Sequence, residues 1–250
     1  MSAFFYALSS PLAAANCLLP ANSDSARIKH IIDGDTLKLQ GEVSVRLLGV
    51  NTPEVARHGK PAQPLAREAT QALQELLGEQ VLLIDGDQRQ DRYGRRLSHV
   101  FSHSGQSAEA ELIERGLGFF VGSDPSTGMA ECLRRAEQRA RAAKRGVWGE
   151  PYWAPLSFNS PALRPGFLIL EGRITQVEKT SKAAWIETDG DVVLRVDHKD
   201  MKRFEARWWQ QLEGRRVLVK GWMVDRNKLR GPHKRWLVRL MYPDMLVMLD

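Results

Sequence analysis

The sequence predicts a mainly β fold with helices, an α+β chain divided into two parts. The first observation is that short stretches of alternating apolar residues, bounded by glycines, occur in both halves and are typical of strands. The second is that four prolines fall between residues 151 and 165, where they indicate a linker. We therefore expect one domain over residues 27–150 and another over residues 166–250.

The first part alternates strand and helix patterns. Residues 27–50 carry strand alternation, with Gly34 and Gly41 marking turns. A helix is expected from the prolines at 61–64 to Gly78, where glycine ends it. The remaining elements expected in this part are strands at 81–84 and 96–101, a helix from Ser107 to Gly116, and an amphipathic helix over 129–145. The basic face of that last helix would either contact phosphates or form a solvated surface, and we favour the solvated surface.

The second part has five strand patterns and one helical pattern in about 85 residues. The expected elements are strands at 167–178, 183–188 and 191–197, a helix at 199–213, and strands at 216–225 and 235–248. This order suits a five-stranded OB barrel.

The charge of the chain is compatible with a polyanionic partner. The 250 residues have a formal net charge of +6, and the pI is about 9.5. The excess is uneven, because residues 165–250 carry a net charge of +5. A solvated surface of no special function is the alternative.

The first residues are similar to a secretory signal. The apolar stretch from Phe4 to Leu12 is followed by Ala13–Ala15, which offers a cleavage site, so we expect a signal peptide over 1–15. The protein would then be periplasmic or secreted. No Lys or Arg precedes the apolar stretch, so a cytoplasmic location is the alternative. Cys17 and Cys132 would be able to pair in an oxidising compartment.

Three short segments of the first part carry side chains suited to phosphodiester hydrolysis. They are Asp33-Gly34-Asp35-Thr36, Arg46 to Glu54, and Asp91-Arg92-Tyr93-Gly94-Arg95. Calcium takes oxygen ligands, and the candidates are the carboxylate of Asp35, the amide oxygen of Asn51 and the main-chain carbonyl near Thr52.

The remaining candidates would act on the phosphate and on the water. Arg46 and Arg95 are each able to donate two hydrogen bonds to a phosphate in a rigid fork. Glu54 follows Pro53 and would serve as general base on water or hold that water in line. Each segment alone is also a common turn, helix entry or hairpin tip. Their joint occurrence in this order favours the catalytic interpretation.

Together with Gly146-Val147-Trp148, these motifs make residues 27–150 resemble the staphylococcal nuclease-like, or thermonuclease, domain. The resemblance implies an OB barrel with three helices and a calcium-dependent nuclease that acts on DNA and RNA and leaves 3′-phosphate products. It also implies that Asp35 and Thr52 are calcium ligands, that Arg46 and Arg95 bind phosphate and that Glu54 is the general base. Asp33 would be an acidic residue near the metal.

One position departs from this family pattern. The family usually has a second calcium-binding aspartate where this chain has Asn51, which keeps an oxygen ligand but loses a negative charge. We expect weaker calcium binding without loss of the chemistry. Phe119 and Phe120 would either stack on a base or fill the barrel, and we favour the barrel core.

Residues 166–250 add a candidate nucleic-acid-binding module. The basic segment 226–235 would connect the last two strands, where OB folds often bind oligonucleotides, and several tryptophans accompany it. A small structural barrel with a tryptophan core is the alternative. The whole chain is thus interpreted as a monomeric nuclease with DNA and/or RNA as its substrate, and the alternative is a catalytically weak or inactive nucleic-acid-binding scaffold of the same fold.

Overall fold

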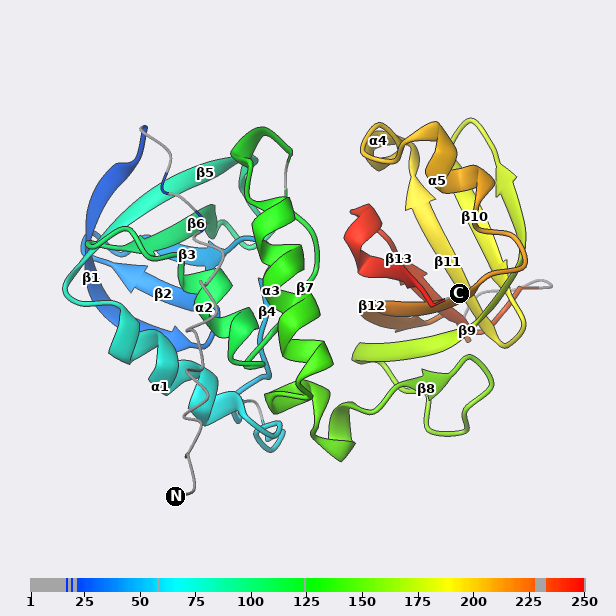
Figure 1. Cartoon of the computed structure of the whole chain (residues 1–250), viewed down its shortest axis with the longest axis horizontal. Coiled ribbons are helices and arrows are strands. Elements are labelled where there is room, and N and C mark those ends of the chain that lie inside the picture. The colour runs from blue at the N-terminus through cyan, green and yellow to red at the C-terminus, as the bar shows by residue number, and fades with distance from the viewer. Residues whose placement is uncertain are drawn as a thin grey trace, which may run out of the picture.

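The computed structural model describes Cys17, Leu19 and residues 22–57, 59–123, 125–227 and 233–249. The expected signal peptide at 1–15 lies outside the described residues. Two β-barrels lie side by side, with helices packed on each (Figure 1). The predicted fold class, a mainly β chain of two barrels, is confirmed.

The first barrel is closed by five strands in the order β1-β2-β3-β6-β5. The strands are β1 (Asp24–Asp33), β2 (Thr36–Leu39), β3 (Ser44–Leu47), β5 (Gln80–Gln90) and β6 (Arg96–Ser102). Only the β3–β6 pair is parallel. Alternate residues such as Leu37, Val45 and Leu83 are at most 1% exposed, because successive side chains of a strand point to opposite faces.

Three helices cover this barrel, namely α1 (Ala66–Leu76), α2 (Ala108–Glu114) and α3 (Ala130–Ala142). Ser107 caps α2, since its side chain accepts a hydrogen bond from the Ala110 N–H. A short pair of strands, β4 (Val50–Asn51) and β7 (Phe119–Phe120), joins the barrel to the helices. Phe119 and Phe120 are fully buried; Phe120 packs in the core of the first barrel, as expected, whereas Phe119 packs in the core of the second.

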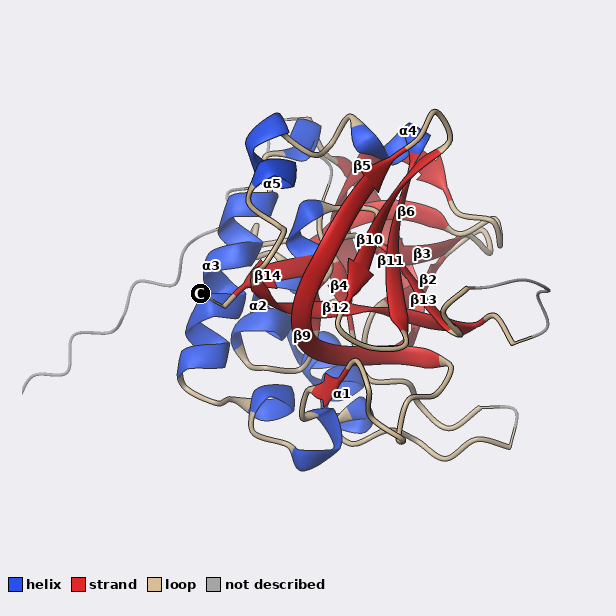
Figure 2. Ribbon diagram, turned by 90° about the vertical axis from the view of Figure 1, so that its right-hand side faces the viewer, coloured by secondary structure: helices blue, strands red, loops and turns tan. Residues whose placement is uncertain are grey.

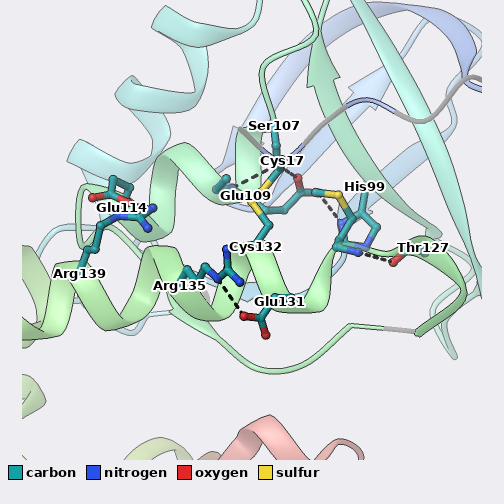
Figure 3. The surroundings of a disulfide bond; sticks show 12 residues. Cys17, His99, Ser107, Glu109, Glu114, Thr127, Glu131, Cys132, Arg135 and Arg139 are labelled. Carbon is teal, nitrogen blue, oxygen red and sulfur yellow. Dashed lines mark hydrogen bonds and ion pairs between the residues drawn. A yellow bond between two sulfur atoms is a disulfide. The ribbon is translucent and has the colours of Figure 1, made fainter. Parts of the chain in front are cut away.

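A disulfide joins Cys17 to α3, and a buried polar network fastens α2 to β6 (Figure 3). Cys17 is bonded to Cys132 of α3, with their Cα atoms 5.6 Å apart. Next to it, Glu109 of α2 is fully buried and accepts hydrogen bonds from the Val100 N–H at 2.9 Å and the Ser107 hydroxyl at 3.0 Å. The sequence therefore brings a distant N-terminal cysteine onto the helix that faces the second barrel.

The second barrel closes with the same strand plan as the first. Its strands are β9 (Gly166–Lys179), β10 (Ala183–Thr188), β11 (Val192–Asp197), β12 (Arg216–Asp225) and β13 (Trp236–Arg239). They follow the order β9-β10-β11-β13-β12, and β12 pairs with β9 to close the barrel. The third and fifth strands, β11 and β13, are parallel, as β3 and β6 are in the first barrel.

Two predicted elements of this barrel are wrong in detail. The helix expected at 199–213 is two short helices, α4 (His198–Met201) and α5 (Ala206–Gln210), because Glu205 has an extended backbone. The strand expected at 235–248 is β13 followed by the 3₁₀ turn η4 (Pro243–Met245) and β14 (Leu246–Met248). Pro243 lacks the N–H that a continuous strand would need in its ladder.

The segment between the barrels is packed. It contains the 3₁₀ turn η3 (Pro151–Trp153) and β8 (Leu156–Ser157), which pairs with β9. The centroid of the Phe119 ring lies 5.3 Å from the ring centroids of Trp148, Trp153 and Phe167, so one aromatic cluster joins the first barrel to the second. Phe119, Val121 and Val147 accordingly belong to the hydrophobic core of the second barrel.

Charged residues also cross between the barrels. Lys220 of β12 is fully buried and pairs with Glu137 of α3, while Arg134 of α3 pairs with Asp244 of η4 at 2.7 Å. The outer face of α3 is thus partly an interface and not only the solvated surface expected from its pattern. The helices of the described ranges include none that is long and apolar enough to span a bilayer.

Candidate active site

The turn between β1 and β2 places two aspartates against the segment that follows β4. A Cβ atom on Gly34 would lie 2.7 Å from both the Thr52 hydroxyl and the Ala69 side chain, so only glycine allows this approach. Asp35 Oδ2 then accepts a hydrogen bond from the Thr52 N–H at 3.0 Å, and its Oδ1 accepts one from the Thr36 hydroxyl at 3.1 Å. Asp35 and Thr52 are therefore neighbours, as their predicted roles require.

Arg46 joins the predicted ligands from the next strand. Its Nη2 atom lies 3.0 Å from Asp35 Oδ2 and donates to Asn51 Oδ1 at 3.4 Å. Its Nη1 atom donates to the carbonyls of Leu47 at 2.6 Å and Val50 at 2.8 Å. The guanidinium is thus held by four residues and is mostly shielded from water. Four predicted site residues, at positions 35, 46, 51 and 52, form one contiguous cluster.

Glu54 lies at the edge of this cluster. Its N–H donates to the Gln63 side chain at 2.7 Å, which anchors the turn after Pro53. Desolvation by the surrounding protein raises the pKa of Glu54, although the side chain reaches solvent, and the negative charges of Asp35 and Asp33 raise it further.

Asp33 completes a concentration of negative charge. It is buried, and its pKa is raised first by desolvation and then by the charge of Asp35. Arg57 from the loop before α1 lies 3.5 Å from its Oδ2 atom and partly balances the charge. Neighbouring negative charges disfavour the ionised form of a carboxyl group, and a nearby cation stabilises that form. The electrostatics of the cluster therefore favour a bound cation.

Arg95 is positioned differently from the other predicted residues. Its Nε atom donates to Asp91 Oδ2 at 2.7 Å, and its backbone N–H donates to Asp91 Oδ1 at 3.0 Å. Its guanidinium also lies 5.6 Å from the centroid of the Tyr93 ring. These contacts stay within its own turn between β5 and β6. The β3–β6 register nevertheless pairs Arg46 with Leu97, two residues beyond Arg95, so the turn adjoins the cluster.

The residues present fit calcium in the chemistry of their donors. Asp35 offers a carboxylate, Asn51 an amide oxygen and Thr52 a main-chain carbonyl, all hard oxygen donors. No group of three or more His, Cys, Asp or Glu side chains gathers as a metal cluster in the described ranges. The predicted ligand set accordingly contains a single carboxylate, that of Asp35.

Sequence reasoning missed the supporting roles of three residues. Gln63 anchors Glu54, Arg57 approaches Asp33, and Asp91 holds Arg95. Gln63 and Arg57 lie in a loop with no periodic pattern, so nothing in their spacing indicated a role. Asp91 had a local signal, because aspartate at the start of a tight turn commonly accepts hydrogen bonds from the backbone N–H groups that follow.

Comparison with known proteins gives one family match and several relatives. Residues 44–150 match the family described as staphylococcal nuclease homologue. The chain is 30% identical to the thermonuclease of Staphylococcus hyicus over 152 residues, which covers 59% of this chain and 89% of that protein. It is 34% identical over 129 residues to endonuclease YncB of Bacillus subtilis (strain 168), which covers 49% of this chain and 61% of that protein.

A third relative is the SPbeta prophage-derived endonuclease YokF of the same Bacillus strain. It is 32% identical over 129 residues, covering 49% of this chain and 43% of that protein. The names of these relatives support a nuclease activity. Matched over most of the length of the Staphylococcus hyicus protein, with its site motifs gathered on the first barrel, this chain belongs to the staphylococcal nuclease family.

Proposed function

We propose that this protein is a calcium-dependent nuclease that hydrolyses phosphodiester bonds of DNA and/or RNA and leaves 3′-phosphate products. The observation that carries the proposal is the cluster in which Arg46 contacts both Asp35 and Asn51, two residues before Pro53-Glu54. Uncatalysed phosphodiester hydrolysis is very slow, so these residues must lower its barrier substantially.

Each residue has a separate task in this proposal. Arg46 and Arg95 bind the phosphate and offset the charge that builds on its oxygens. Arg46 Nη2 exchanges its present carboxylate and amide partners for phosphate oxygens, while the Leu47 and Val50 carbonyls keep Nη1 in place. Glu54 holds the attacking water and accepts its proton.

Asp35, Asn51 and the Thr52 carbonyl would hold calcium. A bound cation of this kind offsets phosphate charge and orients the substrate. Asp33 adds negative charge beside these ligands without being one of them. The raised pKa values of Asp33 and Glu54, both partly caused by the charge of Asp35, support a cation at this position.

Cleavage of labelled single-stranded DNA and RNA, with calcium and with chelator, tests the proposal, and end-group analysis of the fragments tests the 3′-phosphate. We expect cutting only with calcium. Arg95→Ala should lower the rate by at least about 100-fold, as expected for loss of a donor to the developing charge. Arg92→Ala is the matched control, because Arg92 belongs to the same turn and its guanidinium packs on the Tyr93 ring.

The alternative is a scaffold that binds nucleic acid without cutting it. The set of Asp35, Arg46, Glu54 and Arg95 supports an enzyme, since a scaffold has no need of a general base beside phosphate-binding arginines. Calcium-independent binding with no product from either nucleic acid would establish the scaffold and overturn the nuclease proposal. Activity that is unchanged in excess chelator would overturn only the metal assignment.

Location, boundaries and oligomeric state are further proposals. We propose a periplasmic or secreted, monomeric protein with a signal peptide over 1–15, a nuclease domain over 27–150, a linker over 151–165 and an OB-like domain over 166–250. The Cys17–Cys132 disulfide supports export, because such bonds persist in oxidising compartments. Mass spectrometry of the protein exported by its native host would show whether the chain begins after Ala15.

A further inference from the structure

The two barrels share one strand plan, so the face that carries the candidate active site has an equivalent in the second barrel. In the first barrel, Arg46 lies on the third strand, β3, and Arg95 lies in the turn between the fourth and fifth strands, β5 and β6. The equivalent elements of the second barrel are β11 and the segment between β12 and β13. Figure 2 shows β10 and β11 toward the front, in the view onto the second barrel.

That face presents a row of one aromatic and two cationic side chains. Trp185 of β10 is the register partner of Arg195 on β11, and Arg195 is the partner of Arg239 on β13. Their neighbours in each strand, such as Ala184, Leu194 and Val238, are buried in the core. Alternation along a strand therefore directs the row to the outer surface. The side chains of Arg195 and Arg239 are 36% and 50% exposed.

The arginines of the row are held in place. Asp197, with a largely buried side chain, lies 2.8 Å from Arg195 Nε through Oδ1 and pairs with Arg239 through Oδ2. The guanidinium of Arg195 lies 5.1 Å from the centroid of the Trp185 ring, and that of Arg226 lies 5.6 Å from it. The single carboxylate of Asp197 thus pairs with two guanidinium groups, so the row keeps a net positive charge beside the Trp185 ring.

The segment between β12 and β13 adds further positive charge. Residues 226–235 contain five Lys or Arg residues and no Asp or Glu, although residues 228–232 lie outside the described part. Of the described cations, Lys234 pairs with Glu187 and Arg235 with Asp225. The turn between β9 and β10, Thr180-Ser181-Lys182, has no carboxylate where the first barrel has Asp35. The chemistry of this face therefore suits binding and not hydrolysis.

We propose that the outer face of β10, β11 and β13 binds single-stranded nucleic acid, with bases stacked on Trp185 and phosphates on Arg195 and Arg239. This inference rests on the proposed function and extends it to a second site on the same substrate. Unstacked bases pack on aromatic rings and guanidinium planes, and a cationic groove follows the backbone. A duplex keeps its bases inside, so it should bind more weakly than a single strand.

Fluorescence anisotropy of a fluorescein-labelled oligothymidylate, titrated with the full chain in EDTA, tests the inference without cleavage. Trp185→Ala should raise the Kd by about 5- to 150-fold, the range for loss of one stacked base, and Trp185→Phe should restore most of the affinity. Trp222→Ala is the matched control. Trp222 of β12 is exposed, lies outside the row and packs on Phe167, which contacts Phe119 of β7, so its loss should leave the Kd unchanged.

The salt dependence of binding gives a second test. Arg195→Gln with Arg239→Gln should flatten the slope of log K against log salt, by about 0.7 for each phosphate of a single strand that an arginine no longer neutralises. An unchanged Kd in Trp185→Ala, with an unchanged slope in the arginine variant, would overturn the inference even if the protein cuts DNA. If binding depends on Trp185 but the protein cleaves neither DNA nor RNA, the proposed nuclease activity would be overturned and the inferred binding site would be supported.

Discussion

Replacing Lys220 by methionine removes one member of the charged pair buried between the barrels. Lys220 of β12 is fully buried, and its partner Glu137 of α3 is 6% exposed. Glu137 also accepts a hydrogen bond from the Phe120 N–H at 2.8 Å through its other oxygen. Methionine has a comparable volume, so the variant chiefly leaves the carboxylate of Glu137 buried without its cation.

The expected loss is about 3–5 kcal/mol in the free energy of unfolding, the usual cost of stranding one charge of a buried pair. A double variant separates charge from packing. Glu137→Gln combined with Lys220→Met removes both charges of the pair, and the glutamine oxygen still accepts a hydrogen bond from the Phe120 N–H. We expect the double variant to be more stable than Lys220→Met alone by at least about 2 kcal/mol, because an uncharged replacement of a buried pair is often nearly neutral.

Urea denaturation followed by tryptophan fluorescence and by far-ultraviolet circular dichroism measures these differences. Arg135→Met is the matched control, since Arg135 pairs with Glu131 on the same helix at 2.8 Å but both side chains are about 60% exposed. Its effect should stay below about 1 kcal/mol. A loss below about 1 kcal/mol for Lys220→Met, or a double variant no more stable than the single one, would refute the reasoning.

Three further predictions concern the metal, the disulfide and one exposed carboxylate. Asn51→Asp should lower the calcium Kd about tenfold in calorimetric titration, since it restores a ligand charge, and an equal Kd would remove Asn51 from the ligand set. Replacing Cys17 and Cys132 by serine should cost about 4–5 kcal/mol of stability, because the bond closes a loop with a sequence separation of 115; reductant should then have no further effect. Hydrogen bonds from two lysines lower the pKa of Glu42 to about 2, which nuclear magnetic resonance titration would test. Its contribution to stability is present above its unfolded-state pKa and is lost as the pH falls toward 2.

The part of the site that was predictable lies in short, continuous motifs. Asp35, Arg46, Asn51 and Thr52 fall within eighteen residues of chain, and two tight strand connections bring them into contact. The motif also named Arg95, but only the structure shows that Asp91 holds its guanidinium within the turn. A motif specifies residue types and order, whereas the partner a long side chain selects depends on what else surrounds it.

The contact between the barrels could not be predicted from the sequence for the same reason. Helix 129–145 has a strong amphipathic pattern, from which Arg134 was expected to be solvated. It pairs with Asp244, 110 residues away, and Glu137 pairs with Lys220, 83 residues away. Periodicity shows which face of a helix is apolar, but it carries no information about a charged partner supplied by a distant strand.

The shared aromatic cluster around Phe119 has a mechanical consequence for a long substrate. Because Phe119 of β7 packs on Trp153 of the connecting segment and on Phe167 of the second barrel, the two binding surfaces are expected to keep a constant spacing. A nucleic-acid strand bound at both surfaces would be cut at a fixed distance from the nucleotides held by the second barrel. Limited digestion should then yield fragments with a preferred minimum length, and loosening the cluster with Phe119→Ala should broaden that distribution.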